Sequence, residues 1–213
     1  MSIAIVIGAT GLVGKCLVRQ LLDDPLYPRV VALVRRATPV QHEKYQEHVV
    51  NFAEPASFAE LVRGDVLFSS MGTTRSQAGS LEAQRMVDYT FQFQVAKLAA
   101  QNGVRNYVLV SAGGAKVNSW SAYLKMKGEL ERDVQTLGFS SVHILRPGLL
   151  KGEREQARSG ERFAEGALGA LNAVGVLPSL RPITGEQVAT FMRHAATLRG
   201  SRVHEPGELF TPT

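Results

Sequence analysis

Short apolar runs alternate along the chain with longer segments in which apolar residues recur every three or four positions. Such runs predict strands buried on both faces, and the three-to-four spacing predicts helices packed on those strands. The predicted strands are residues 3–7, 30–34, 48–51, 65–70, 107–110 and 141–145. Helices are predicted from residue 12, and at residues 55–63, 81–101 and 119–137. Strands that alternate with helices predict an α/β fold with right-handed crossovers, a doubly wound parallel sheet.

The first predicted strand ends in three evenly spaced glycines, Gly8, Gly11 and Gly14, and a helix begins among them. Gly8 permits a sharp turn, Gly11 leaves room for a phosphate, and Gly14 permits close packing of the helix on the strand. The helix N-terminus then offers free N–H groups and the positive end of its dipole to an anion. This corner predicts dinucleotide binding, and a glycine turn that serves only the backbone is the alternative.

Two arginines, Arg35 and Arg36, follow the second predicted strand. In a dinucleotide fold this strand end meets the adenosine ribose, and NAD-specific proteins place a carboxylate there. Guanidinium groups bind a 2′-phosphate bidentately, so the pair predicts NADP(H) as the cofactor. A solvated pair at a strand end is the alternative. The small-residue turn at Gly72 and Thr73 is a further cofactor candidate, or an ordinary strand-to-helix loop.

Tyr123 and Lys127 lie four positions apart on a predicted helix and therefore on the same helix face. An ammonium beside a phenol favours the phenolate and brings it toward the working range for proton transfer. Ser111 ends the preceding predicted strand and would hydrogen-bond a substrate carbonyl. Tyr123 would protonate the carbonyl oxygen, and Lys127 would also hold the nicotinamide ribose. The alternative to this catalytic role is that both residues lie on a surface helix and serve only its charge and packing.

The regular alternation weakens after the turn formed by Arg146, Pro147 and Gly148. We therefore expect residues 1–148 to form the dinucleotide-binding domain and residues 149–213 to form a small substrate-binding or lid segment packed on it. Thr184 and Gln187 fit a capping box that starts a last helix, ending at about residue 198. The apolar stretch at residues 163–180 either covers the substrate or forms a homodimer contact, and the sequence leaves both open.

Composition narrows the function classes further. The 213 residues, of which 45% are hydrophobic and 20% charged, suffice for one well-buried domain. The formal charge is +5, but the basic residues form no long run and do not alternate with aromatic residues, so we expect no nucleic-acid partner. No apolar run reaches the length of a membrane span and no secretory signal is visible, which predicts a cytoplasmic protein without a membrane partner. One cysteine, Cys16, and scattered histidines predict no metal site.

Six segments occur in the order GATGLVG, LVRR, DVLFSSMGTTR, LVSAGGA, YLKMKGELE and LRPGLLKGEREQAR. Together they resemble the short-chain dehydrogenase/reductase superfamily, and most of all its atypical branch typified by the human Tat-interacting-protein oxidoreductase. The resemblance implies an NADPH-binding Rossmann domain with a short substrate lobe and with Tyr123 and Lys127 as catalytic residues. The residues that it places on the cofactor are Thr10, Gly11, Leu12 and Val13 at the diphosphate, Arg35 and Arg36 at the 2′-phosphate, Gly72 and Thr73 at the adenosine side, and Leu150 and Arg158 as a cover.

Two positions depart from the superfamily pattern. Asp88 stands where many relatives have an asparagine, which weakens the claim to a full proton relay. Ala112 replaces the second residue of the usual serine pair, so Ser111 is the only hydroxyl offered there.

The function expected is an NADPH-dependent oxidoreductase that reduces a small carbonyl compound. A sugar-nucleotide epimerase is a variant, although the roughly 65 residues after Gly148 leave little protein to enclose a sugar nucleotide. The rival class is an NADP(H)-binding module that senses redox state or binds a protein without turnover.

Overall fold

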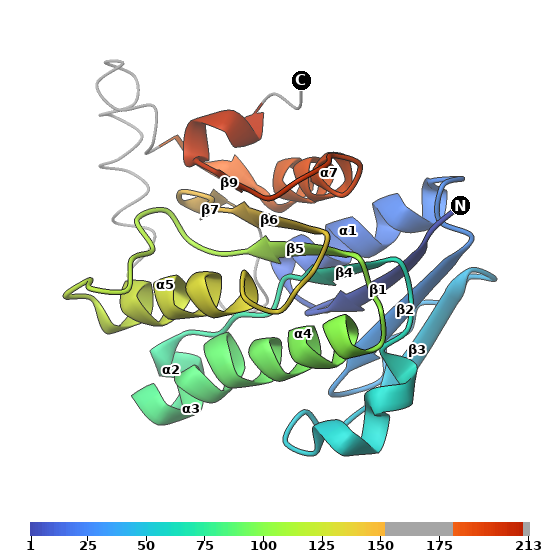
Figure 1. Ribbon diagram of the computed structural model, residues 1–213, viewed down its shortest axis with the longest axis horizontal. Coiled ribbons are helices and arrows are strands. Elements are labelled where there is room, and N and C mark those ends of the chain that lie inside the picture. Colours follow the sequence, from blue (N-terminus) through green and yellow to red (C-terminus); the bar gives the residue numbers. More distant parts are fainter. Residues whose placement is uncertain (152–180, 211–213) are drawn as a thin grey trace.

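The computed structural model describes residues 1–151 and 181–210, and among these residues seven parallel strands form one sheet (Figure 1). The strands are β1 (Ile3–Ile7), β2 (Arg29–Val34), β3 (Tyr45–Val49), β4 (Val66–Ser69), β5 (Asn106–Val110), β6 (Ser141–Leu145) and β9 (Arg202–His204). The sheet order is β3-β2-β1-β4-β5-β6-β9. The predicted doubly wound parallel sheet is therefore confirmed.

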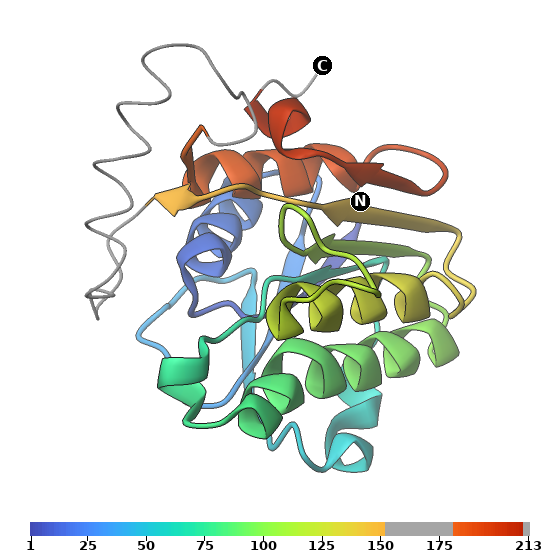
Figure 2. The same ribbon diagram turned by 90° about the vertical axis from the view of Figure 1, so that its left-hand side faces the viewer.

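Helices cover both faces of this sheet (Figure 2). The α-helices are α1 (Leu12–Asp23), α2 (Arg75–Ala78), α3 (Leu81–Arg85), α4 (Phe91–Gln101), α5 (Ala122–Val134) and α7 (Gly185–Ala195). The other helical turns are the 3₁₀ turns η1 (Pro55–Leu61) and η4 (Pro206–Phe210) and the π-helical turn η2 (Met86–Thr90), which joins α3 to α4. Helices α1 and α7 pack together on one face, and α4 and α5 pack together on the other.

The residues of β1 alternate between two hydrophobic cores. Ala4 and Val6 belong to the core that includes α1 and α7, whereas Ile5 and Ile7 belong to the core that includes α4 and α5. All four side chains are fully buried. Burial of an isoleucine side chain stabilises the fold by roughly 1.5–3 kcal/mol, so a strand covered on both faces favours an apolar residue at every position.

The order of the sheet reverses at β1, because β2 pairs with one edge of this strand and β4 with the other. The chain that follows β1 forms α1 on one face, and the chain that follows β4 leads to α4 on the opposite face. Connections that leave neighbouring strands toward opposite faces open a crevice at the carboxyl ends of those strands. The functional site is expected in that crevice.

Part of the expected lid segment belongs to the main layers. Strand β9 pairs in parallel with β6, and α7 packs on α1, so the boundary predicted at residue 148 does not separate these elements from the sheet. Thr184 and Gln187 form the predicted capping box of α7, which ends at Ala195 rather than near residue 198. A second, two-stranded parallel sheet pairs β7 (Leu150–Lys151) with β8 (Ile183–Thr184). Arg158 and the apolar stretch at 163–180 lie outside the described residues.

In the two described ranges, no helix combines the length and the apolar character needed to cross a bilayer.

Candidate functional site

The turn between β1 and α1 has no room for side chains at two of its glycines. Gly8 has a φ of +82°, a conformation that favours glycine. A Cβ on Gly8 would lie 2.5 Å from the backbone nitrogen of Met71, and a Cβ on Gly14 would lie 2.0 Å from the carbonyl oxygen of Gly8. These contacts agree with the steric roles expected for both glycines. Gly14 packs against the turn and does not line the pocket described below.

The N-terminus of α1 fits a bound anion. Its capping residue is Gly11, which has no side chain, so the first N–H groups of the helix receive no side-chain cap. The first turn also contains no acidic residue. Since the first N–H groups of a helix have no partner inside the helix, they can bind phosphate oxygens. The corner therefore fits the diphosphate of a dinucleotide.

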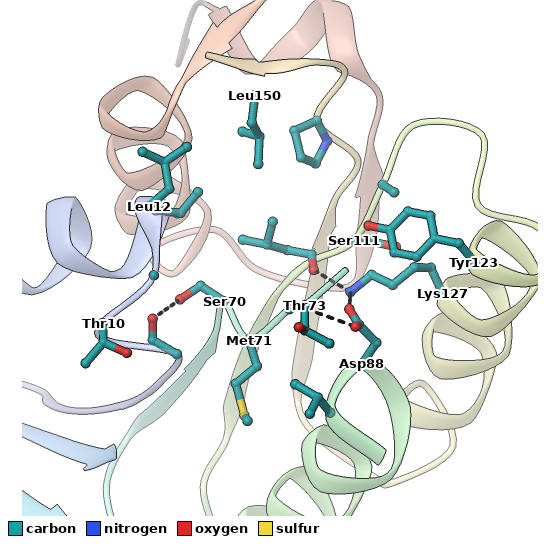
Figure 3. Close-up of a pocket in the computed structure, with 18 of the residues that line it drawn as sticks. Thr10, Leu12, Ser70, Met71, Thr73, Asp88, Ser111, Tyr123, Lys127 and Leu150 are labelled. Atoms are coloured by element: carbon teal, nitrogen blue, oxygen red, sulfur yellow. Dashed lines mark hydrogen bonds and ion pairs between the residues drawn. The ribbon is translucent and has the colours of Figure 1, made fainter. Parts of the chain in front are cut away.

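A pocket of about 1200 Å³ opens at this corner and extends to α5 (Figure 3). Common small-molecule sites enclose roughly 300–1,000 Å³, so the pocket offers room for a dinucleotide and a second small ligand. The predicted site residues that line it are Gly8, Thr10, Gly11, Leu12, Val13, Arg35, Arg36, Gly72, Thr73, Ser111, Tyr123, Lys127 and Leu150. The structure thus brings together residues from segments far apart in the sequence.

Arg35 and Arg36 line this pocket directly after β2, and both are exposed. Glu47 on the neighbouring strand β3 anchors the chain just beyond them, because its carboxylate accepts a hydrogen bond of 2.8 Å from the backbone N–H of Thr38. Two cations therefore lie at the strand end where a dinucleotide fold places the adenosine ribose.

Helix α5 carries Tyr123 and Lys127 one turn apart at the pocket. Tyr123 is 37% exposed, whereas Lys127 is 2% exposed. The ammonium of Lys127 donates to the carbonyl oxygen of Val110 at 3.2 Å and lies 4.0 Å from Oδ1 of Asp88. Burial lowers the pKa of Lys127, and neighbouring carboxylates oppose that shift. Tyr123, Ser111 and Lys127 all line the pocket (Figure 3).

Ser111 lines the pocket, but its hydroxyl donates to Glu131 of α5. Glu131 is buried and also pairs with Arg146 at 2.6 Å, and Arg146 pairs in turn with Glu205 at 2.8 Å. A paired carboxylate can only accept hydrogen bonds, so the hydroxyl proton of Ser111 is directed at Glu131. The structure therefore does not support the expected hydrogen bond from Ser111 to a substrate carbonyl.

Asp88, which the resemblance placed at the asparagine position of the proton relay, lines the pocket, although it was not among the predicted site residues. It lies in η2, is 1% exposed, and its Oδ2 accepts a hydrogen bond of 3.0 Å from the backbone N–H of Thr73. The carboxylate thus joins the loop after β4 to Lys127. A regular helix was predicted over 81–101, and a π-helical turn adds one residue that changes the direction of the side chains. Met71 and Pro206 also line the pocket without having been predicted.

A family model described as NAD(P)H-binding matches residues 8–197 of the chain. Protein FMP52 of Coccidioides immitis is 37% identical over 191 residues, which cover 83% of this chain and 76% of that protein. Protein FMP52 of Eremothecium gossypii is 44% identical over 159 residues, covering 74% and 70%. Among solved structures, MoeE5 in complex with UDP-glucose and NAD has a TM-score of 0.71 at 18% identity, covering 94% of this chain and 74% of that chain. This last likeness shows a shared fold alone.

Both FMP52 relatives are named as mitochondrial proteins, which contradicts the expected cytoplasmic location. That expectation rested on the lack of a visible secretory signal and of an apolar span, and neither observation bears on mitochondria. The family match supports an NAD(P)H-binding protein, and membership of the Tat-interacting-protein branch stays a prediction.

Proposed function

Because this chain belongs to the NAD(P)H-binding family, we propose that it is an NADPH-dependent oxidoreductase of the short-chain dehydrogenase/reductase type that reduces a small carbonyl compound. The observation that carries the proposal is the position of Tyr123 and Lys127 on the wall of the pocket that also contains the glycine corner. A pocket that contains both a proton donor and a dinucleotide-binding site has the groups needed for hydride transfer to a carbonyl.

The glycine corner and the N-terminus of α1 would hold the cofactor diphosphate. Arg35 and Arg36 support NADP(H) over NAD(H), because a guanidinium binds a 2′-phosphate bidentately while a carboxylate would repel it. Gly72, Thr73 and Leu150 line the same pocket and complete the proposed cofactor contacts, with Arg158 as a further predicted contact outside the described residues.

NADPH supplies the hydride when it is bound. The phenol of Tyr123 is partly exposed and donates the proton that the carbonyl oxygen takes up. The ammonium of Lys127, one helical turn away, stabilises the phenolate that Tyr123 becomes. Lys127 is held for this task by the carbonyl oxygen of Val110 and by Asp88. Ser111 contributes only lone pairs to a ligand, since its proton is directed at Glu131.

A turnover assay tests this proposal against its two alternatives. The purified protein is mixed with NADPH, and separately with NADH, and a broad panel of aldehydes and ketones, and nucleotide oxidation is followed by absorbance. We expect turnover with at least one carbonyl compound, and a preference for NADPH. Tight NADPH binding without turnover would favour the sensing module, and interconversion of UDP-sugars without net nucleotide oxidation would favour the epimerase. A protein that binds neither nucleotide would refute the proposal.

A further inference from the structure

The carboxylate of Asp88 and the ammonium of Lys127 form an ion pair in the interior of the protein. The two side chains are 1% and 2% exposed, and Nζ of Lys127 lies 4.0 Å from Oδ1 of Asp88 (Figure 3). A buried ammonium without a nearby carboxylate tends to lose its proton, because a low-dielectric interior disfavours the charged form. A buried carboxylate at this distance opposes that loss.

The backbone around Asp88 fixes the direction of this carboxylate. Gln92, which is fully buried, donates to the carbonyl oxygens of Asp88 at 2.9 Å and of Val87 at 3.3 Å, both in η2. Its own side-chain oxygen accepts from Ser69 at the end of β4 at 2.8 Å. The π-helical turn is therefore tied to the sheet, and Asp88 is aimed between Thr73 and the ammonium.

An aspartate and an asparagine share the acceptor that Thr73 needs, but the asparagine has no charge and carries an NH2 donor in place of the second oxygen. Either side chain could accept the hydrogen bond that Thr73 N–H donates to Oδ2. Only the carboxylate supplies a negative charge to the buried ammonium of Lys127. The hydrogen bond alone therefore gives no reason for an acid at this position, whereas the ion pair does.

Other charged groups face Lys127 on the elements that pack against it. Tyr123 and Glu131 lie one turn away on either side along α5, and η2 contributes Asp88. Strand β5 contributes only the uncharged carbonyl group of residue 110. The charge of Glu131 is balanced by Arg146, which follows β6 and lies 2.6 Å from it. Asp88, in contrast, forms its ion pair with Lys127 itself.

We propose that Asp88 is a positioning residue that keeps Lys127 in the ammonium form beside Tyr123, a role that rests on the proposed reductase function. The carboxylate would act through Lys127 and would not itself touch the substrate. Burial lowers the pKa of Lys127, and Asp88 is the first of the neighbours that raise it.

The direct test follows the charge of Lys127 by NMR and needs no turnover. The protein is labelled with ¹³C at the lysine Cε, and the Lys127 signal is assigned with Lys127→Met. In the wild type we expect Lys127 to remain protonated through about pH 7, and in Asp88→Asn its titration midpoint should fall by about one to three pH units. Asp133→Asn is the control, because Asp133 lies on α5 with Lys127 but outside the pocket. This variant should leave the titration midpoint of Lys127 unchanged. Equal midpoints in the wild type and Asp88→Asn, or a neutral Lys127 in the wild type at pH 7, would overturn the proposal.

The pH profile of turnover gives a second measurement. Asp88→Asn should approach wild-type turnover at low pH and lose it as pH rises, because the ammonium deprotonates earlier in the variant. An equal loss at every pH would indicate a purely structural role for Asp88 and would also overturn the proposal. If the wild type shows no turnover, the reductase function fails while the NMR titration still decides whether Asp88 holds the charge on Lys127.

Discussion

Replacement of Gly14 by alanine tests how tightly α1 must pack on the turn after β1. The new Cβ would lie 2.0 Å from the carbonyl oxygen of Gly8 and 2.9 Å from Cα of Ala9, where ordinary contact begins at 3.4 Å. All the nearest atoms belong to the backbone, so no side chain can rotate away. The start of α1 would have to move by about 1.4 Å from the turn. That shift would loosen the buried contacts of Leu17 and Leu21.

Overpacking typically destabilises a fold by 1–3 kcal/mol, and a backbone obstruction should give about 3 kcal/mol or more. For a domain of this size each kcal/mol lowers the midpoint of thermal unfolding by about 2–4 °C, so Gly14→Ala should lower it by about 6–12 °C. NADPH affinity should fall as well, because the same movement distorts the diphosphate seat. Circular dichroism and a fluorescence titration with NADPH measure the two effects.

Gly207 provides a matched control, since a Cβ at this exposed position would meet no atom within 4 Å. Gly207→Ala should change the unfolding free energy by less than about 0.5 kcal/mol and leave NADPH affinity unchanged. If Gly14→Ala melts at the same temperature as Gly207→Ala, the account of how the corner is packed is wrong.

Two further predictions concern charge. Burial lowers the pKa of His143 and of His204 below the ordinary value of 6.5. Near and below pH 6.5 the unfolded chain therefore binds more protons at these residues than the folded protein does. Their contribution to the free energy of unfolding is complete above pH 6.5 and is lost as the pH falls. The urea concentration at the midpoint of unfolding should fall less between about pH 7 and pH 5 in His204→Gln than in the wild type. Equal falls in the two proteins would contradict the proposed role of the buried histidines. Arg35→Ala and Arg36→Ala should each weaken NADPH binding by roughly tenfold in a calorimetric titration and leave NADH binding unchanged. The exposed Arg63→Ala is the control, and equal affinity of the wild type for NADPH and NADH would refute the arginine argument.

The strands that lie inside the sheet could be predicted closely from the sequence. The range 141–145 matches β6, and 3–7 matches β1, because strands covered on both faces carry short runs of mainly apolar residues. The edge strand β3 runs over Tyr45–Val49 instead of the predicted 48–51, because it has a neighbour on one side only and carries polar residues. Strand β9 was missed, since a run of three residues with Arg202 in it carries no periodic signal.

The site was predictable wherever its chemistry depends on local spacing. The glycine corner and the pair of Tyr123 and Lys127 are set by positions within one turn or one helix, and the pocket contains both. The partners of these residues come from distant segments. Asp88 contacts Lys127 from the π-helical turn η2, and the hydroxyl of Ser111 donates its hydrogen bond to Glu131 of α5. Neither contact has a signature in residue spacing.

The central claim is that Tyr123 donates a proton in a reduction that uses NADPH. Its most direct test measures kcat and the NADPH dissociation constant for the wild type and for Tyr123→Phe with the best substrate of the carbonyl panel. Tyr89→Phe is the control, since this phenol bonds Asp133 and does not line the pocket. We predict that Tyr123→Phe lowers kcat by about 10²- to 10⁴-fold and leaves NADPH binding nearly unchanged. Undiminished turnover in Tyr123→Phe would contradict the claim.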